Sequence, residues 1–197
     1  MSKAQTDQTS PILLSFLEQF QTERLTIRAP QWGDGAMVNE AMRESVEELR
    51  PWLPFARNLP TPEESEIRSR QARLQFLDRS DMMLYVFETA SGAFVASSGL
   101  HRIDWAARRF EIGYWLRTSC TGKGMITEAV HGITDFAIQH LEANRLEIRC
   151  DSRNTRSAKV AERAGFTLEG ILRNVEYDEE GTLASQMIFA KVRGIEF

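Results

Sequence analysis

The chain has 197 residues, of which 42% are hydrophobic and 26% are charged. These values are ordinary for a single globular domain that buries a sizeable core. The formal net charge of −4 argues against a general affinity for nucleic acids or acidic membranes, so we expect neither as a direct partner.

The N-terminal part of the chain begins with a polar stretch. Residues 1–10 are rich in Gln, Thr and Ser, and we expect residues 1–20 to be a loose segment that precedes one domain over residues 21–197. Neither a run of ~18 apolar residues nor a convincing signal peptide is present, so we expect a cytoplasmic protein. Within the domain, Arg24–Arg28 alternates polar and apolar residues, as a strand with one buried face does.

Two helices are expected next. Residues 34–49 are rich in Met, Glu and Arg and predict a helix, which the proline-containing segment 51–55 ends. A second helix begins at Thr61, because Pro62 suits the first turn and Glu64 completes a capping box.

The rest of the chain alternates between strands and helices. Period-two alternation predicts the strands, and apolar residues at helical spacing predict a long helix. In chain order we expect strands over 84–89, 93–100 and 110–117, a helix from 125 to 141, a strand over 146–150, a helix from Asn154 to Gly165, and strands over 166–172 and 183–192. This order predicts a mixed α/β (α+β) domain around one largely antiparallel sheet, with a right-handed parallel crossover over residues 110–150.

The glycine-rich turn 121–124 lies directly between a predicted strand and a predicted helix. Gly122 and Gly124 would let a ligand approach the backbone, where the free N–H groups of the helix start attract phosphate oxygens. Two familiar phosphate motifs do not fit, because Lys123 is followed by glycine and Thr127 stands where a dinucleotide fingerprint has its third glycine. A purely steric role for the two glycines is the alternative.

Four stretches in this order carry a family resemblance: Glu111–Leu116, Gly122–Gly124, Asn154–Ser157 and Gly165-Phe166. Together they resemble the GNAT superfamily of N-acetyltransferases, and more narrowly its RimJ/RimL group, which acetylates ribosomal proteins. The resemblance spans residues 23–192. It implies a sheet whose middle strands splay apart, flanked by about four helices, and a possible homodimer.

The resemblance also implies acetyl-CoA as the donor. Pantetheine would pair like an added strand with the backbone of Tyr114, Trp115 and Leu116. Its diphosphate would bind the N–H groups of Thr121, Gly122, Lys123, Gly124, Met125 and Ile126. Asn154 would hold the pantetheine arm, and the Thr127 hydroxyl would be a further donor. The chain departs from the family pattern at Ser119, where Gln or Arg is common.

The catalytic residues are also assigned through the resemblance. Ser157 would give a proton to the departing thiolate, and Glu176, between the last two strands, would take the proton of the amine. Tyr177 is a rival acid and Glu111 a rival base. The alternatives are structural: Ser157 suits a plain helix N-terminus, and Glu176 suits a solvated loop. The three histidines suggest no Ser-His-Asp triad, so we expect direct transfer to the amine.

RimL-like enzymes place a segment of this kind over the acceptor side, which implies that role for Trp52, Leu53 and Phe55. The three residues could equally brace the second helix.

The function expected first is acetylation of a protein N-terminus, such as that of a ribosomal protein. Acetylation of a small amine (a polyamine, an amino acid or an aminoglycoside) and a non-catalytic acyl-CoA-binding module remain open. Cys120, Cys150 and the histidines never cluster at ligand spacing, so we expect reduced thiols and no metal.

Overall fold

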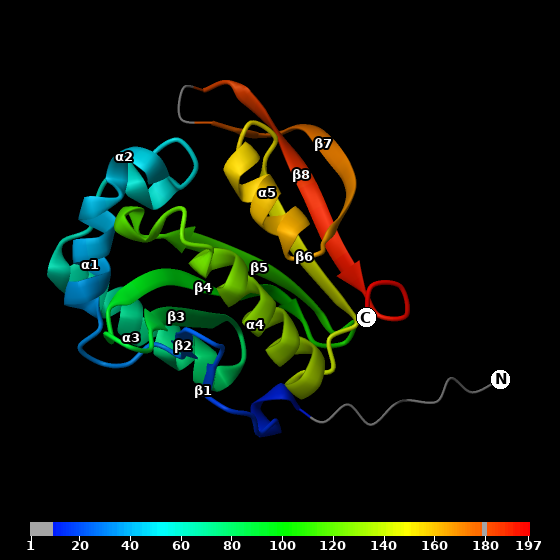
Figure 1. The fold of residues 1–197 in the computed structure, drawn as a ribbon, viewed down its shortest axis with the longest axis horizontal. Helices are drawn as coiled ribbons and strands as arrows, with labels where there is room; N and C mark the ends of the chain where they lie inside the picture. Colours follow the sequence, from blue (N-terminus) through cyan, green and yellow to red (C-terminus); the bar gives the residue numbers. More distant parts are fainter. Residues whose placement is uncertain (1–9, 179–180) are drawn as a thin grey trace.

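The structure is a computed structural model that describes residues 10–178 and 181–197. Figure 1 shows one twisted sheet with helices packed against it. The α-helices are α1 (Gly35–Glu44), α2 (Val46–Leu49), α3 (Pro62–Asp78), α4 (Met125–His140) and α5 (Thr155–Arg163). The strands are β1 (Gln19–Gln21), β2 (Leu25–Arg28), β3 (Met82–Glu88), β4 (Phe94–Asp104), β5 (Arg109–Leu116), β6 (Arg145–Asp151), β7 (Thr167–Tyr177) and β8 (Leu183–Val192).

The eight strands form one sheet in the order β1-β2-β3-β4-β5-β6-β8-β7. All neighbours are antiparallel except β5 and β6, which are parallel. The parallel pair holds together over only three positions, from Arg109↔Arg145 to Glu111↔Glu147. Beyond these pairs the two strands separate, and α4 connects them across the sheet (Figure 1). The predicted mixed, largely antiparallel fold with splayed middle strands is confirmed.

Side chains cover both faces of the sheet, because successive strand residues point to opposite sides. Leu84 and Val86 of β3 belong to a core cluster with the buried faces of α4 and α5. Tyr85 and Phe87 belong to a second cluster with the buried faces of α1 and α2. The sheet is therefore the middle layer of the domain.

Most predicted elements are found, but the first predicted helix is wrong in one respect. Residues 34–49 form two helices, α1 and α2, that are separated at Ser45. The Ser45 side chain is fully buried, and its hydroxyl accepts the N–H of Thr118 at 2.9 Å. The described residues thus contain five α-helices in place of about four.

The N-terminal segment also differs from the expectation. Residues 1–9 lie outside the described residues. From residue 10 onward the chain is packed: Phe16 makes edge-to-face contacts with Phe76 and Phe136, and Phe20 stacks on Phe136 with 4.8 Å between ring centroids. The part of the segment before β1 therefore lies against the core of the domain.

The last hairpin is longer than predicted. β7 continues to Tyr177, and Glu176 pairs with Ala184 of β8. Glu176 is consequently part of a strand and not of the connection between the last two strands. The register shifts between Leu172 and Glu176, where Asn174 has a φ of 53°. This irregularity lies outside what period-two alternation can predict.

A close contact between α1 and α3 fixes the helices on one side of the sheet. The predicted capping box at Thr61 and Glu64 is present. Glu66, in the first turns of α3, accepts the N–H groups of Gly33 and Gly35 at 2.8 and 2.9 Å. The Arg70 guanidinium and these two N–H groups lower the pKa of Glu66 to about 2. A Cβ atom on Gly35 would lie 2.3 Å from the Glu66 backbone.

We therefore expect Gly35→Ala to lower the free energy of unfolding by about 2–3 kcal/mol, because the two helices must move apart. Gly170→Ala is the matched control. No atom lies within 4 Å of a Cβ at Gly170, so its effect should stay within about 0.5 kcal/mol. Urea unfolding of the three proteins measures both values. Equal stability of the two variants would contradict the tight contact.

Candidate active site

A cavity of ≈ 820 Å³ opens where β5 and β6 separate. Its walls come from the end of β5, the start of α4, the start and one face of α5, the hairpin β7–β8, and the segment after α2. The cavity brings together most of the predicted site residues: Trp52, Leu53, Tyr114, Trp115, Leu116, Thr121, Gly122, Gly124, Met125, Ile126, Thr127, Asn154, Ser157, Glu176 and Tyr177. Lys123, Phe55 and Glu111 do not line it.

The glycine turn before α4 presents unused hydrogen-bond donors to this cavity. Gly122 and Gly124 have φ angles of 75° and 76°, which disfavour side chains with a Cβ. In the part of the chain that the structure describes, the N–H groups of residues 124–127 have no hydrogen-bond partner. They form the positive end of α4, a 16-residue helix, where an anion is stabilised.

Thr127 adds a side-chain donor to the same place. Its hydroxyl oxygen is buried and, among the described residues, has no hydrogen-bond partner. A buried hydroxyl without a partner is costly, so it indicates a group that a ligand completes. Lys123 contributes differently: its carbonyl oxygen accepts a hydrogen bond from Arg24 at 3.1 Å, which holds the turn against the start of β2.

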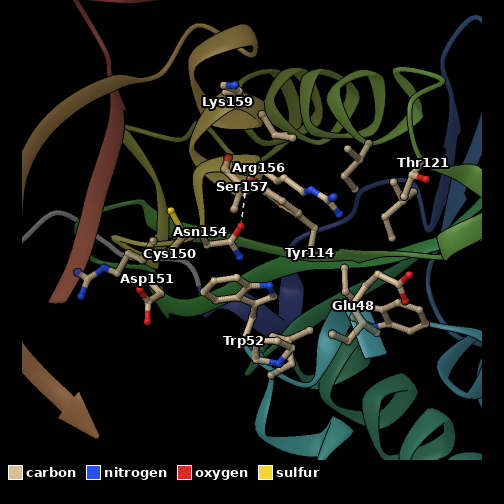
Figure 2. Close-up of a pocket in the computed structure, with 18 of the residues that line it drawn as sticks. Glu48, Trp52, Tyr114, Thr121, Cys150, Asp151, Asn154, Arg156, Ser157 and Lys159 are labelled. Carbon is tan, nitrogen blue, oxygen red and sulfur yellow. Dashed lines mark hydrogen bonds between the residues drawn. The ribbon is translucent and has the colours of Figure 1, made fainter. Parts of the chain in front are cut away.

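Ser157 and Tyr114 meet inside the cavity (Figure 2). Their hydroxyl oxygens lie 3.0 Å apart, and the Tyr114 hydroxyl also donates to the Ser157 carbonyl oxygen at 3.1 Å. The Asn154 side chain caps α5 by accepting the Ser157 N–H at 3.1 Å. Burial raises the pKa of Tyr114, so its hydroxyl keeps its proton at neutral pH. The family resemblance predicts only a backbone role for Tyr114. The side-chain contact joins residues 43 positions apart, which no local pattern reveals.

Cys150 lies beside Ser157 in the cavity wall (Figure 2). Burial raises the pKa of its thiol, partly offset by a hydrogen bond with the Ser157 side chain. The thiol is therefore protonated at neutral pH. Cys150 remains a reduced cysteine in this structure, as does Cys120.

Glu176 lines the cavity from the hairpin β7–β8. Its carboxylate is exposed and lies 3.5 Å from the side-chain amide of Gln186. The rival acid Tyr177 also lines the cavity and is 70% exposed. The rival base Glu111 lies elsewhere, where its carboxylate faces Arg149 at 3.3 Å and Arg102 at 3.6 Å. The geometry therefore separates Glu111 from the other candidates.

The segment after α2 forms the facing wall. Trp52 and Leu53 line the cavity, and Trp52 is 37% exposed. Phe55 turns the other way and packs against Trp115, with 6.0 Å between ring centroids. Its expected place on the acceptor side is therefore not observed. The structural alternative, bracing the helical layer, describes Phe55 better.

Charged residues that the sequence reasoning missed divide the cavity. Asp151 and Asp178 line the cavity with Glu176, and Arg153 bridges Asp151 and Asp178 at 2.6 and 2.9 Å. Glu48 lies apart from them, on the side of Thr121 (Figure 2), where its carboxylate accepts the Thr118 hydroxyl at 3.1 Å. The Arg153 guanidinium lowers the pKa of Asp151. Three cations of α5 line the other part of the cavity: Arg156, Lys159 and Arg163. The spacing of these three cations along one helix face can be recognised in the sequence. The carboxylates come from separate elements, so no local pattern predicts that they line the same cavity.

Two further observations concern the described residues as a whole. No group of three or more His, Cys, Asp or Glu side chains among them could hold a metal ion. None of the helices in the described ranges is both long and apolar enough to cross a membrane.

Comparison with known proteins shows the family. The family description "Acetyltransferase (GNAT) domain" matches residues 24–167. The chain thus belongs to the GNAT family of acetyltransferases, and it is an N-acetyltransferase by that membership.

The chain is also similar to curated bacterial proteins. It is 32% identical over 160 residues to a Bacillus subtilis protein named "Putative ribosomal N-acetyltransferase YdaF", which covers 79% of this chain and 84% of the relative. It is 31% identical over 132 residues to the ribosomal-protein-serine acetyltransferase of Escherichia coli, covering 65% of this chain and 73% of the relative.

Two solved structures share the fold. The RimL ribosomal L7/L12 α-N-protein acetyltransferase in complex with coenzyme A has a TM-score of 0.83 and 21% identity, over 89% of this chain and 98% of that one. The microcin C7 self-immunity acetyltransferase MccE, in complex with acetyl-CoA and AMP, has a TM-score of 0.80 and 22% identity, over 87% and 93%.

The unpaired Thr127 hydroxyl leads to a prediction with a matched control in the same helix. Thr134 also has a buried hydroxyl without a partner among the described residues, but it does not line the cavity. The free energy of unfolding of both Thr→Val variants should equal that of the parent or exceed it by up to about 1–2 kcal/mol, because each substitution removes an unsatisfied buried group.

Only Thr127→Val should weaken binding of coenzyme A, by roughly tenfold, because one hydrogen bond to a charged group is lost. Isothermal titration with coenzyme A and thermal unfolding of the free proteins measure the two effects. Unchanged affinity of Thr127→Val, or an equal loss in Thr134→Val, would contradict a ligand role for the Thr127 hydroxyl.

Proposed function

We propose that this protein transfers the acetyl group of acetyl-CoA to the N-terminal amine of a protein, a ribosomal protein in the first instance, in the cytoplasm. The observation that carries the proposal is the cavity itself. A proton donor, Ser157, and a proton acceptor, Glu176, face it from different walls. The free N–H groups of α4 open onto the same space. The names of the curated relatives support the choice of acceptor.

The donor would lie along the gap between β5 and β6. The backbone of residues 114–116 pairs with β4 on one side and has no strand partner on the side of the gap. The amides of pantetheine could pair there as an added strand does. The diphosphate would bind the N–H groups of residues 124–127 and the Thr127 hydroxyl, which brings the thioester towards Ser157.

Acetyl transfer forms a bond between the amine nitrogen and the acetyl carbon as the bond from that carbon to sulfur breaks. The protein must therefore remove a proton from the ammonium form of the acceptor and supply one to the sulfur. In our proposal the Glu176 carboxylate takes the first proton, directly or through water. The Ser157 hydroxyl gives the second, and the proton that the nitrogen still loses as the amide forms returns to Ser157. The Tyr114 hydroxyl keeps Ser157 oriented from 3.0 Å away.

The acceptor would enter at the carboxylate end of the cavity. Asp151, Glu176 and Asp178 line this end, and such a group attracts the ammonium form of an amine. Trp52 and Tyr177 provide apolar surface for the residues that follow a protein N-terminus. The same carboxylates would also suit a small cationic amine, so polyamines and aminoglycosides form the second candidate class of acceptors.

Two substitutions test the proton transfers. We expect Ser157→Ala and Glu176→Gln to lower kcat by roughly 10²-fold each, because general acid–base catalysis is typically worth ~10²–10⁴-fold. Both should keep the affinity for coenzyme A within about threefold of the parent value. The assay follows thiol release from acetyl-CoA, and titration calorimetry gives the affinity. A Glu176→Gln enzyme with normal kcat at every pH would remove Glu176 as the base.

The acceptor class is tested by incubating the protein with acetyl-CoA and a panel of amines. The panel contains N-terminal peptides of ribosomal proteins, the same peptides blocked at the N-terminus, polyamines and aminoglycosides. We expect thiol release with the free peptides and none with the blocked ones. Release with polyamines or aminoglycosides alone would move the assignment to a small amine. Binding of coenzyme A without any release would favour a non-catalytic binding module.

A further inference from the structure

The turn end of the hairpin β7–β8 extends past the end of β6 (Figure 1). Strand β6 pairs with β8 only as far as Asp151↔Gln186. One further backbone bond lies just past this pair, from the Ser152 N–H to the Ser185 carbonyl oxygen at 2.8 Å. Glu176 pairs with β8 closer to the hairpin turn. Among the described residues, the part of the hairpin that carries the proposed base therefore has no strand partner on the β6 side.

Arg153 connects this end of the hairpin to the end of β6. Its guanidinium contacts Asp151 through Nη2 at 2.6 Å and Nε at 3.0 Å, and it contacts Asp178 through Nη1 at 2.9 Å. The Arg153 N–H also donates to the Asp151 carboxylate at 2.8 Å. Asp151 is the last residue of β6, whereas Asp178 directly follows β7. The planar guanidinium thus joins the two elements in a fixed geometry. We call these contacts the Arg153 bridge.

Asp178 links the Arg153 bridge to Glu176. Its Oδ1 atom accepts the N–H of Thr182 at 2.8 Å, and its own N–H donates to the Thr182 carbonyl oxygen at 2.8 Å. Residues two apart in an extended chain point to the same side, and Glu176 and Asp178 both line the cavity. The position of Asp178 consequently restrains the place of the Glu176 carboxylate in the cavity.

The two carboxylates of the Arg153 bridge are more covered than the cation. The side chains of Asp151 and Asp178 are 14% and 11% exposed, whereas that of Arg153 is 51% exposed. Ion pairs with an exposed partner contribute little to stability, so we expect the chain to fold without this cation. Two covered carboxylates that lose it repel each other. The end of the hairpin would then move away from β6.

We propose that Arg153 is a positioning residue for acetyl transfer, which holds the hairpin β7–β8 so that Glu176 reaches the acceptor amine. This inference rests on Glu176 as the base in the proposed function. Arg153 itself does not line the cavity, so it acts through Glu176. A misplacement of ~1 Å in a catalytic group can lower a rate by ~10²-fold. The effect of Arg153 on kcat should therefore disappear when residue 176 can no longer accept a proton.

A double-mutant cycle of Arg153→Gln and Glu176→Gln tests the proposal. Arg153→Gln should lower kcat roughly tenfold in the parent and by less than about twofold in the Glu176→Gln background. The KM for the acceptor should not rise, because the carboxylates that attract an ammonium group remain. Arg145→Gln is the matched control. Arg145 likewise bridges two carboxylates, Glu147 and Glu169, but at the other end of β6 and away from the cavity. Its kcat should stay within about twofold of the parent value.

Hydrogen–deuterium exchange measures the Arg153 bridge independently of catalysis. In Arg153→Gln, the amides of residues 174–178 and 183–186 should exchange faster than in the parent, and those of residues 145–150 should not. Unchanged exchange would overturn the proposal. If Glu176→Gln lowers kcat, an unchanged kcat of Arg153→Gln, or equal losses in the two backgrounds, would also overturn it. A normal kcat of Glu176→Gln would refute the base of the proposed function and the positioning role with it. Circular dichroism establishes that each variant is folded.

Discussion

The short pairing between β5 and β6 is the constraint on which the site depends. The strands pair over only three positions, yet each remains bonded to its outer neighbour: β5 to β4 as far as Leu116, and β6 to β8 as far as Asp151. Each strand therefore has a free backbone edge inside the sheet. Free edges with unused N–H and C=O groups are usually confined to the rim of a sheet. Here they enclose a space that an extended, amide-containing ligand can fill.

The direction of the two strands then decides what gathers at the gap. Because β5 and β6 are parallel, their carboxyl ends lie at the same edge of the sheet, and a helix begins shortly after each of them. Two helix N-termini consequently open onto one cavity, as is typical of ligand sites in α/β proteins. The start of α4 offers unpaired N–H groups. The start of α5 brings Ser157 within 3.0 Å of Tyr114 on β5.

Local chemistry allowed much of this to be predicted from the sequence. The capping box at Thr61 and the glycine turn at residues 122–124 depend on neighbours along the chain, so their sequence signals are sufficient. What could not be predicted depends on packing at a distance. At the break between α1 and α2, Ser45 is hydrogen-bonded to Thr118. Phe55 packs against Trp115 and does not line the cavity.

The two proposed catalytic residues show the same division. Ser157 could be placed on a helix start from the pattern around Asn154, and the structure has it there. The position of Glu176 within β7 depends on the register shift near Asn174. Such a shift interrupts the two-residue alternation from which strands are predicted. The proton-transfer roles of both residues stay predictions. The cavity brings the two side chains to a common space.

The distribution of charge favours one orientation of the two substrates. Asp151 of β6 lines the cavity together with Glu176 and Asp178 of the hairpin β7–β8, while α5 cations and the N–H groups of α4 line another part. An anionic nucleotide and a cationic amine would then be attracted to different ends and would meet where Ser157 lies. Charges separated by more than about 8 Å are largely screened at physiological ionic strength, so each end acts on its own ligand without cancelling the other. A chain with a small net charge can in this way bind two oppositely charged substrates in a fixed orientation.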